Sequence, residues 1–218
     1  MKKIALTAFV ALFPFQAMAA DHIWAGPYIG VSAGYIEHRT KLNDPTYNLT
    51  SGDILTHGDG GIFSADAGYN FQAGPIVYGV ETDFGWSTAE YELNVFSGRD
   101  AIVRNKLDYV GTVRARIGFA LDRALIYATG GYAYGRVDNY STSDITNAAY
   151  GAGTKGWQSG WTAGAGLEYA ADENWTLRAE GLYLDLGSVT NYYPAFPSDP
   201  MTFHNSAILG RFGVNYKF

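Results

Sequence analysis

The stretch LDYVGTVRARIGFALDRALIYATGGYAYG, residues 107–135, decides the fold because its first half has two unlike faces. As a strand, this half places apolar side chains on one face and Thr112, Arg114 and Arg116 on the other. After a turn at Leu121-Asp122-Arg123, a second run rich in Tyr, Ile, Ala and Gly follows, so the stretch predicts an antiparallel hairpin. In this second run, aromatic residues occur at both odd- and even-numbered positions, so the pattern does not show which face of the strand points into the barrel.

Residues 1–19 have the pattern of a signal peptide. Lys2 and Lys3 precede an apolar run over residues 4–15, and Ala17-Met18-Ala19 supplies small residues for cleavage. That run is too short to span a bilayer as a helix, and no later stretch has about 18 consecutive apolar residues. We therefore expect an exported chain that begins at Ala20, with residues 20–218 forming one domain.

Charge and composition exclude several classes of function. The formal net charge is −6, and it falls further once the two leader lysines are removed, so we expect no nucleic-acid partner. The chain has no cysteine, which excludes a disulfide-stapled scaffold and a cysteine-ligated metal site. The combination of 27 glycines with 16% aromatic residues favours many short strands.

Alternating apolar and polar residues predict eight strands. They are residues 24–35, 62–71, 76–86, the two halves of 107–135, 160–169, 175–185 and 205–218. Four long polar loops, at 37–60, 87–105, 137–156 and 188–203, alternate with short turns. The last of these contains three prolines, so we do not expect it in a central strand. The pattern predicts an all-β, eight-stranded antiparallel barrel with long loops at one end and short turns at the other.

The charged residues within the strands decide which face meets lipid. They share the glycine-rich face, whereas a soluble barrel would carry charge on its outside. An arginine in lipid near the midplane would cost about 2–4 kcal/mol. We therefore predict a transmembrane barrel with a lumen charge network: Asp66, Glu81, Asp83, Arg114, Arg116, Glu168, Arg178, Glu180 and Arg211, with Lys217 as a further candidate. Opposite charges in a lumen this narrow favour a closed network over the alternative, an ion path.

The last eight residues, RFGVNYKF, indicate how the barrel is assembled. Arg211, Gly213, Tyr216 and Phe218 have the pattern of the signal that the barrel assembly machinery reads in a last strand. With the leader, this pattern places the chain in the outer membrane of a Gram-negative cell. The expected partners are outer-membrane lipid and that machinery.

Several segments carry a family resemblance. They are WAGPYIGVSAGY (24–35), GVETDFGW (79–86), GTVRARIGFALDRALIYATGGYAYG (111–135), GWTAGAGLEYAADENWTLRAEGLYLDLG (160–187) and RFGVNYKF (211–218). The chain resembles the small outer-membrane β-barrel family of alphaproteobacteria, which includes porin-like surface antigens and hemin-binding proteins and is related in plan to the barrel of outer membrane protein A. The resemblance implies the fold and the location, whereas the loops carry what differs between members.

The hemin-binding members imply one candidate ligand set. It consists of His38, His57 and His204, which we expect on extracellular loops, with Tyr47, Tyr140, Tyr192 and Tyr193. Because the histidines lack metal-site spacing, the alternative is that they belong to solvated loops, and we expect no metal and no resident cofactor.

One pair has the spacing of a catalytic site. His204-Asn205-Ser206 matches the His and Ser of lipid-deacylating barrels, but no Asp or Glu follows His204 to orient it. We therefore expect no enzyme. The expected function is structural, that of a surface protein that supports envelope integrity. The alternatives are hemin or small-solute capture and transport, and adhesion to a surface or host partner through the aromatic loops at 43–56 and 192–203.

Overall fold

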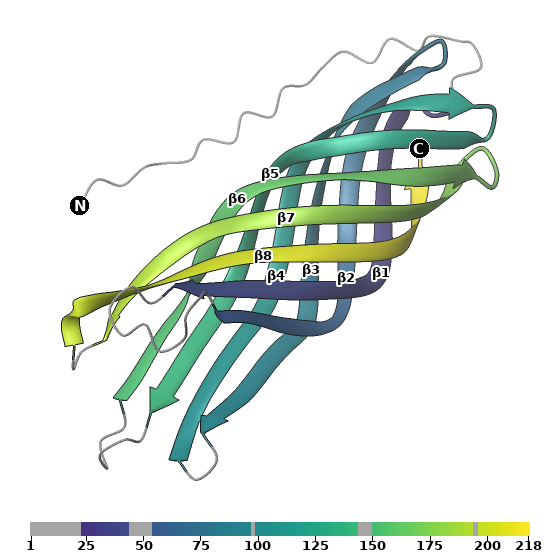
Figure 1. Cartoon of the computed structure of the whole chain (residues 1–218). Helices are drawn as coiled ribbons and strands as arrows, with labels where there is room; N and C mark the ends of the chain where they lie inside the picture. The colour runs from purple at the N-terminus through teal and green to yellow at the C-terminus, as the bar shows by residue number, and fades with distance from the viewer. Residues whose placement is uncertain (1–22, 44–53, 97–98, 144–149, 194–195) are drawn as a thin grey trace.

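The computed structural model describes residues 23–43, 54–96, 99–143, 150–193 and 196–218, which form a closed antiparallel barrel (Figure 1). The strands are β1 (Gly26–Asn43), β2 (Ile54–Ala73), β3 (Ile76–Phe96), β4 (Arg99–Leu121), β5 (Ala124–Ser143), β6 (Tyr150–Ala170), β7 (Trp175–Tyr193) and β8 (Phe196–Lys217). Each strand pairs with the next, and β8 pairs with β1, so the sheet has no free edge. The predicted eight-stranded barrel is confirmed. The predicted signal peptide, residues 1–19, lies outside the described residues.

All the regular elements of the described barrel are strands. No helix in the described part of the chain is long and apolar enough to span a bilayer. The short connections β2–β3, β4–β5 and β6–β7 lie at one end of the barrel, together with the end of β8 (Figure 1). Two of these turns contain residues with positive φ, Gly74 at 59° and Asp122 at 53°. The opposite strand ends, those nearest the predicted loops at 37–60, 87–105, 137–156 and 188–203, therefore lie at the other end of the barrel.

The strands continue well beyond their predicted ends, and the prediction of loops at 37–60, 87–105, 137–156 and 188–203 is wrong for much of their length. β1 runs to Asn43 and keeps its pairing with β2 as far as Leu42 opposite Ile54. Outside the bilayer both faces of a strand meet water, so the apolar alternation stops while the backbone hydrogen bonds continue. Even Pro197 and Pro200 lie within β8, close to a register shift where a missing N–H is tolerated.

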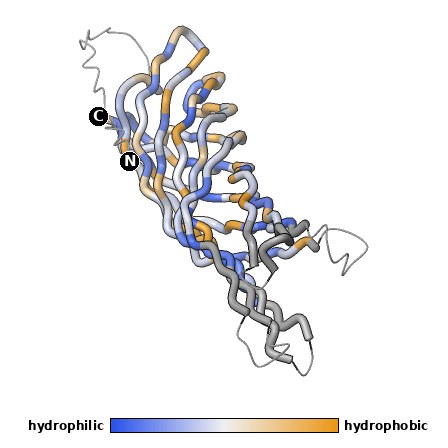
Figure 2. Tube along the Cα trace, turned by 90° about the vertical axis from the view of Figure 1, so that its left-hand side faces the viewer, coloured by the Kyte–Doolittle hydropathy of each residue, from blue (hydrophilic) through white to orange (hydrophobic). Residues whose placement is uncertain are grey.

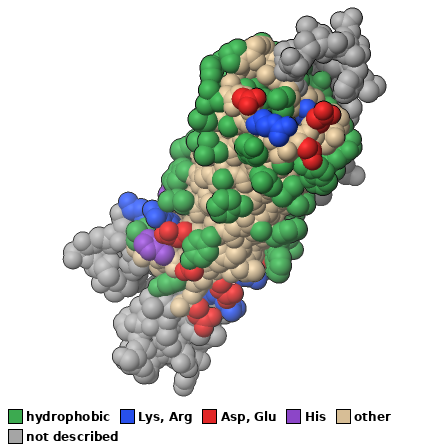
Figure 3. Space-filling view, turned by 90° about the vertical axis from the view of Figure 1, so that its right-hand side faces the viewer, with side chains coloured by type: hydrophobic (Ala, Val, Ile, Leu, Met, Phe, Trp, Pro, Cys, Tyr) green, Lys and Arg blue, Asp and Glu red, His purple; other side chains and the backbone are tan. Residues whose placement is uncertain are grey.

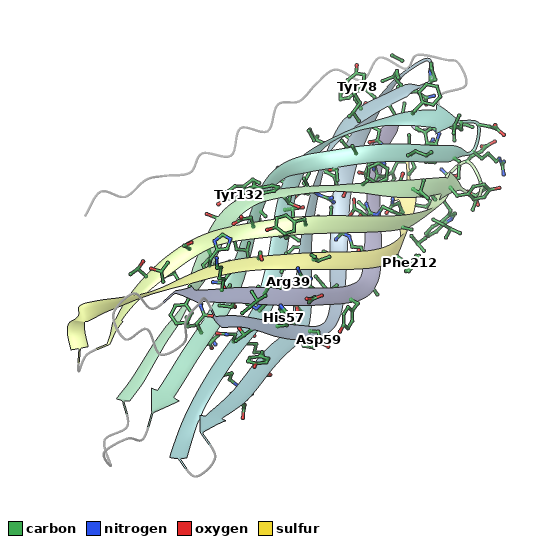
Figure 4. The ribbon with its side chains drawn as sticks, in the orientation of Figure 1. Arg39, His57, Asp59, Tyr78, Tyr132 and Phe212 are labelled. Atoms are coloured by element: carbon green, nitrogen blue, oxygen red, sulfur yellow. The ribbon has the colours of Figure 1, made fainter. Side chains whose placement is uncertain are left out.

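A belt of apolar side chains surrounds the middle of the outer face. Figure 3 shows hydrophobic side chains over the middle of the barrel and charged ones gathered toward its two ends, and Figure 2 shows hydrophobic and hydrophilic residues alternating along the strands. Phe212, labelled in Figure 4, is 74% exposed, which only lipid makes favourable. Along β7 the belt runs from Trp175 to Tyr183, a length that matches the roughly 9–11 residues of a tilted transmembrane strand.

The second half of residues 107–135 lies in β5, and its side chains alternate between the lumen and the outer face. In β5, Leu125 and Tyr127 are buried in the lumen. Ile126 and Tyr132 lie on the outer face and are exposed. Tyr132 is labelled in Figure 4. The aromatic residues of β5 therefore have two roles. Tyr127 fills part of the lumen, whereas Tyr132 faces lipid.

Asp172 stabilises the β6–β7 turn. Its Oδ1 accepts the backbone N–H of Asn174 and of Trp175, both at 2.8 Å. These two hydrogen bonds favour the charged form and lower the pKa of the Asp172 carboxyl below its usual value of 3.8. Because the pKa is lower in the folded state, the carboxylate stabilises the fold above pH 3.8 and loses this contribution as the pH falls through the folded pKa.

We expect Asp172→Ala to unfold at a lower urea concentration than the parent barrel at pH 7, because two backbone donors lose their acceptor. The two midpoints should converge at a pH below the folded pKa, where the carboxyl is protonated in both states. Urea titrations of the barrel in lipid vesicles at the two pH values measure this, with the exposed neighbour Glu173→Ala as the matched control. An equal loss at both pH values would contradict the assigned role.

Candidate functional site

Nine charged side chains from six strands meet inside the lumen, at the level of the apolar belt. They are Asp66, Glu81, Asp83, Arg114, Arg116, Glu168, Arg178, Glu180 and Arg211, and none is more than 5% exposed. Strand register places opposite charges side by side at Glu81–Arg114, Glu168–Arg178 and Glu180–Arg211. The residues that strand parity assigns to the lumen are thus brought into one cluster, hereafter the lumen network.

Arg114 and Arg211 share three carboxylates, those of Glu180, Asp83 and, at 4.0 Å from Arg211, Glu81. Arg114 lies 2.9 Å from Glu180 and 3.1 Å from Asp83, and it also contacts Glu81. Arg211 lies 2.7 Å from Glu180 and 3.2 Å from Asp83. Because β4 and β7 are not neighbours, the Arg114–Glu180 pair joins opposite sides of the wall across the lumen.

Glu81 links this group to a second one. Arg178 lies 2.6 Å from Glu81 and 2.6 Å from Asp66. The Tyr28 hydroxyl donates to Glu81 at 2.5 Å. With Arg114 on its other oxygen, Glu81 has partners from β1, β4 and β7. A buried carboxylate with this many donors has its charge compensated where water is excluded.

Arg116 completes the network toward the short-turn end. Its guanidinium lies 3.2 Å from Glu168 and donates to the Tyr28 hydroxyl at 3.0 Å. It also lies over the Tyr127 ring, 4.0 Å from the centroid. Neither tyrosine was predicted as a network member, although Tyr28 alternates with the outward residues of β1 and this pattern could have placed it in the lumen.

Apolar side chains pack in the lumen on both sides of the network, and the sequence pattern did not predict these two layers. Toward the end of the barrel opposite the short turns, the layer contains Ile36, Ile62, Ala89, Leu107, Val110, Ala133, Val137, Leu182, Leu184, Leu186, Ala207 and Leu209. Toward the short turns, Trp24, Val77, Leu125, Tyr127 and Ala170 form a second cluster. A space beside Trp24 and Tyr28 measures only about 10 Å³, too little for more than one water. The network is therefore enclosed between two apolar layers.

The residues of the predicted assembly signal lie on both faces of β8. Arg211 belongs to the lumen network, and Gly213 faces inward, where an added side chain would meet Ser32 of β1. Tyr216 and Phe218 contact each other, with ring centroids 5.2 Å apart. Lys217 donates to the carbonyl of Ile23 rather than to a network carboxylate.

The expectation that His38, His57 and His204 lie on loops is wrong, because the strands extend past the membrane. His38 belongs to β1 and is buried in the lumen, with Nε2 3.2 Å from Oδ1 of Asn205. His57 of β2 and His204 of β8 lie on the outer face, where Figure 4 shows His57 beside Arg39 and Asp59. His38 therefore cannot share a hemin face with the other two.

Most of the other residues predicted to bind hemin or a surface partner have side chains that the structure does not describe. This holds for Tyr47, Tyr140, Tyr192 and Tyr193 and for most of the segments 43–56 and 192–203. Among the described residues, no three His, Asp or Glu side chains are grouped as metal ligands. The lumen network is thus the site that the structure defines in most detail.

Comparison with known proteins agrees with this architecture. The chain matches the family model "Outer membrane protein beta-barrel domain" over residues 5–218. It is 35% identical to the 31 kDa outer-membrane immunogenic protein of Brucella melitensis, with 100% of both chains covered. It is 32% identical to the 25 kDa outer-membrane immunogenic protein of Brucella abortus over 92% of this chain and 82% of that one. The outer membrane protein OprG of Pseudomonas aeruginosa has the same fold, with a TM-score of 0.62, 15% identity and coverage of 89% and 96%. The chain is an outer-membrane protein and belongs to the outer membrane protein β-barrel domain family.

Proposed function

We propose that the protein is a structural barrel that supports the envelope and passes no solute through its lumen. The observation that carries this proposal is the lumen network, enclosed by an apolar layer on each side. Its four arginines each contact at least two carboxylates, and Arg114 and Arg178 have side chains with no measurable exposure. Such a lumen anchors the wall from inside, as a core does in a soluble domain.

An ion path fits this interior poorly. A permeating ion needs polar groups that replace its hydration shell along the whole route. Here the side chains of Leu107, Leu182 and Leu184 offer none, and the carboxylates below them are already paired with guanidinium groups. Separating those pairs would leave buried charges without compensation, which typically costs about 3–5 kcal/mol per pair. The geometry therefore favours support of the membrane over transport.

The experiment joins two measurements. We expect the refolded parent barrel to pass no ionic current in planar bilayers, and Arg114→Ala to pass none either, because the apolar layers stay in place. We also expect cells that lack the protein to become more sensitive to detergents and large antibiotics, and the parent gene to restore resistance. Stepwise currents through the parent barrel, or unchanged sensitivity of the deletion strain, would contradict the proposal.

A further inference from the structure

A second group of polar side chains lies on the outer face, apart from the lumen network. Ser188 Oγ is 3.1 Å from Nδ1 of His204, which belongs to the neighbouring strand β8. Nε2 of the same imidazole is 3.5 Å from Oδ2 of Asp185. Asp185, on β7, is in turn held by the N–H of Gly187, which donates to its Oδ1 at 2.8 Å. The three side chains thus form a continuous Ser–His–Asp row.

The backbone explains why residues 185 and 188 both reach the same imidazole. The register between β7 and β8 shifts between Asp185 and Ser188, and Gly187 has a φ of +76°, which favours glycine. This bulge turns Ser188 to the same outer face as Asp185. Bulges of this kind re-aim side chains next to functional sites.

The contacts assign a chemical role to each group. If the Ser188 hydroxyl donates to Nδ1, then Nε2 carries the proton and faces the Asp185 carboxylate. This is the arrangement in which an imidazole accepts a serine proton while a carboxylate orients it. Ser188 is exposed, so a substrate has access to it.

The position of the row selects the substrate class. It lies directly beyond Tyr183, which contacts Trp161 at the rim of the apolar belt, with ring centroids 5.4 Å apart. The ester bonds of membrane lipids lie at this level, between the headgroups and the acyl chains. A substrate that reaches Ser188 from the bilayer would therefore present an acyl ester.

The lipid-facing wall below the row is hollowed. A depression of about 510 Å³ runs over β6, β7 and β8, and small residues such as Ala165, Ala179, Gly181 and Gly210 line it. Gly181 is four residues from Asp185 along β7, a distance of about 13 Å in a strand. Because this surface faces the hydrocarbon, its natural occupant is an acyl chain, which would extend from the depression toward the row.

We propose that Asp185, Ser188 and His204 form a hydrolytic site for an acyl ester of an outer-leaflet lipid. Ser188 Oγ attacks the ester carbonyl carbon while His204 Nδ1 accepts its proton. The carbonyl then re-forms, the bond to the alcohol oxygen breaks, and the leaving alcohol takes the proton from His204. Water attacks the acyl-serine in the same way, releasing the fatty acid and restoring Ser188. Asp185 is a positioning residue that holds the imidazole.

This assignment differs from the pairing that the sequence suggests. The spacing of His204 and Ser206 points to Ser206 as the nucleophile, with no carboxylate following His204 in the chain. In the structure Ser206 is paired with Asp185 across the sheet, and the hydroxyl within hydrogen-bond distance of His204 belongs to Ser188. Both the carboxylate and the hydroxyl come from β7, which linear spacing does not show.

The test uses a fluorophosphonate probe on the full barrel refolded in detergent micelles. We expect the probe to label Ser188, Ser188→Ala to abolish labelling and His204→Ala to slow it by about 100-fold. Asp185→Asn should also slow labelling, because the imidazole loses its orientation and its tautomer. Ser206→Ala, the matched control on the same rim, should label at the parent rate. The faster gel migration of unheated barrels verifies folding for each variant.

The substrate class has its own readout. We expect p-nitrophenyl esters of long fatty acids to be hydrolysed faster than p-nitrophenyl acetate, and Gly181→Leu, whose side chain would enter the open depression, to reduce only the long-chain rate. The proposal is overturned if the folded parent is not labelled, if the label is on Ser206, or if labelling is insensitive to His204→Ala. Equal effects of Gly181→Leu on both esters would overturn the acyl-chain assignment.

Discussion

Arg114→Ala is expected to lower the free energy of unfolding by about 3–5 kcal/mol, because it removes one guanidinium and leaves three buried carboxylates short of a partner. Glu81, Asp83 and Glu180 each lose a contact in a lumen that admits little water. Urea titration of the barrel in lipid vesicles, followed by tryptophan fluorescence, measures the change.

Two controls separate charge compensation from the loss of side-chain volume. Arg104→Ala removes an exposed arginine that lies 2.6 Å from Glu90 at the outer rim, and it should cost about 1 kcal/mol or less. The double variant Arg114→Ala/Glu81→Gln also removes one of the stranded carboxylate charges, so it should recover part of the loss. If Arg114→Ala cost no more than Arg104→Ala, the lumen network would not be the main internal support of the wall.

The fold was predictable because the bilayer imposes its pattern on each strand. Within the belt, lipid on one side and a narrow lumen on the other force strict alternation, so the facing of Arg114 and Arg116 follows from parity alone. Past the belt this constraint ends, and the extensions of β1 to Asn43 and of β7 to Tyr193 had no apolar signal. They exist because neighbouring backbones continue to pair, which depends on the whole sheet.

The composition of the lumen network was predictable, but its pairings were not. Parity shows that Arg178 and Asp66 both point inward, yet β7 and β2 are not neighbours, and their contact depends on the diameter of the closed barrel. Leu182 and Leu184 were missed for another reason. The lipid-facing Tyr183 lies between them, so consecutive residues on both faces of the strand are apolar. Such a run does not show that Leu182 and Leu184 form a layer inside the barrel.

Val113→Arg is the complementary experiment, because Val113 is the immediate neighbour of Arg114 but points to the lipid instead of the lumen. Its side chain is 53% exposed near the middle of the belt. We expect the substitution to cost about 2–4 kcal/mol, since a guanidinium in hydrocarbon at this depth has neither water nor a carboxylate within easy reach. The same titration in vesicles measures it, with Val113→Leu as a control that keeps the surface apolar.

A depth control makes the prediction specific to lipid. Ser159 is also exposed on the outer face, but it lies between Trp157 and Trp161 at the rim of the belt. Ser159→Arg should cost only about 0–1 kcal/mol, because an arginine there reaches the headgroups. In detergent, where the apolar layer is thinner and more fluid, the cost of Val113→Arg should shrink toward that of Ser159→Arg. If the two arginines cost the same in vesicles, the assignment of this face to lipid would be wrong, since only a depth-dependent hydrocarbon layer distinguishes the two positions.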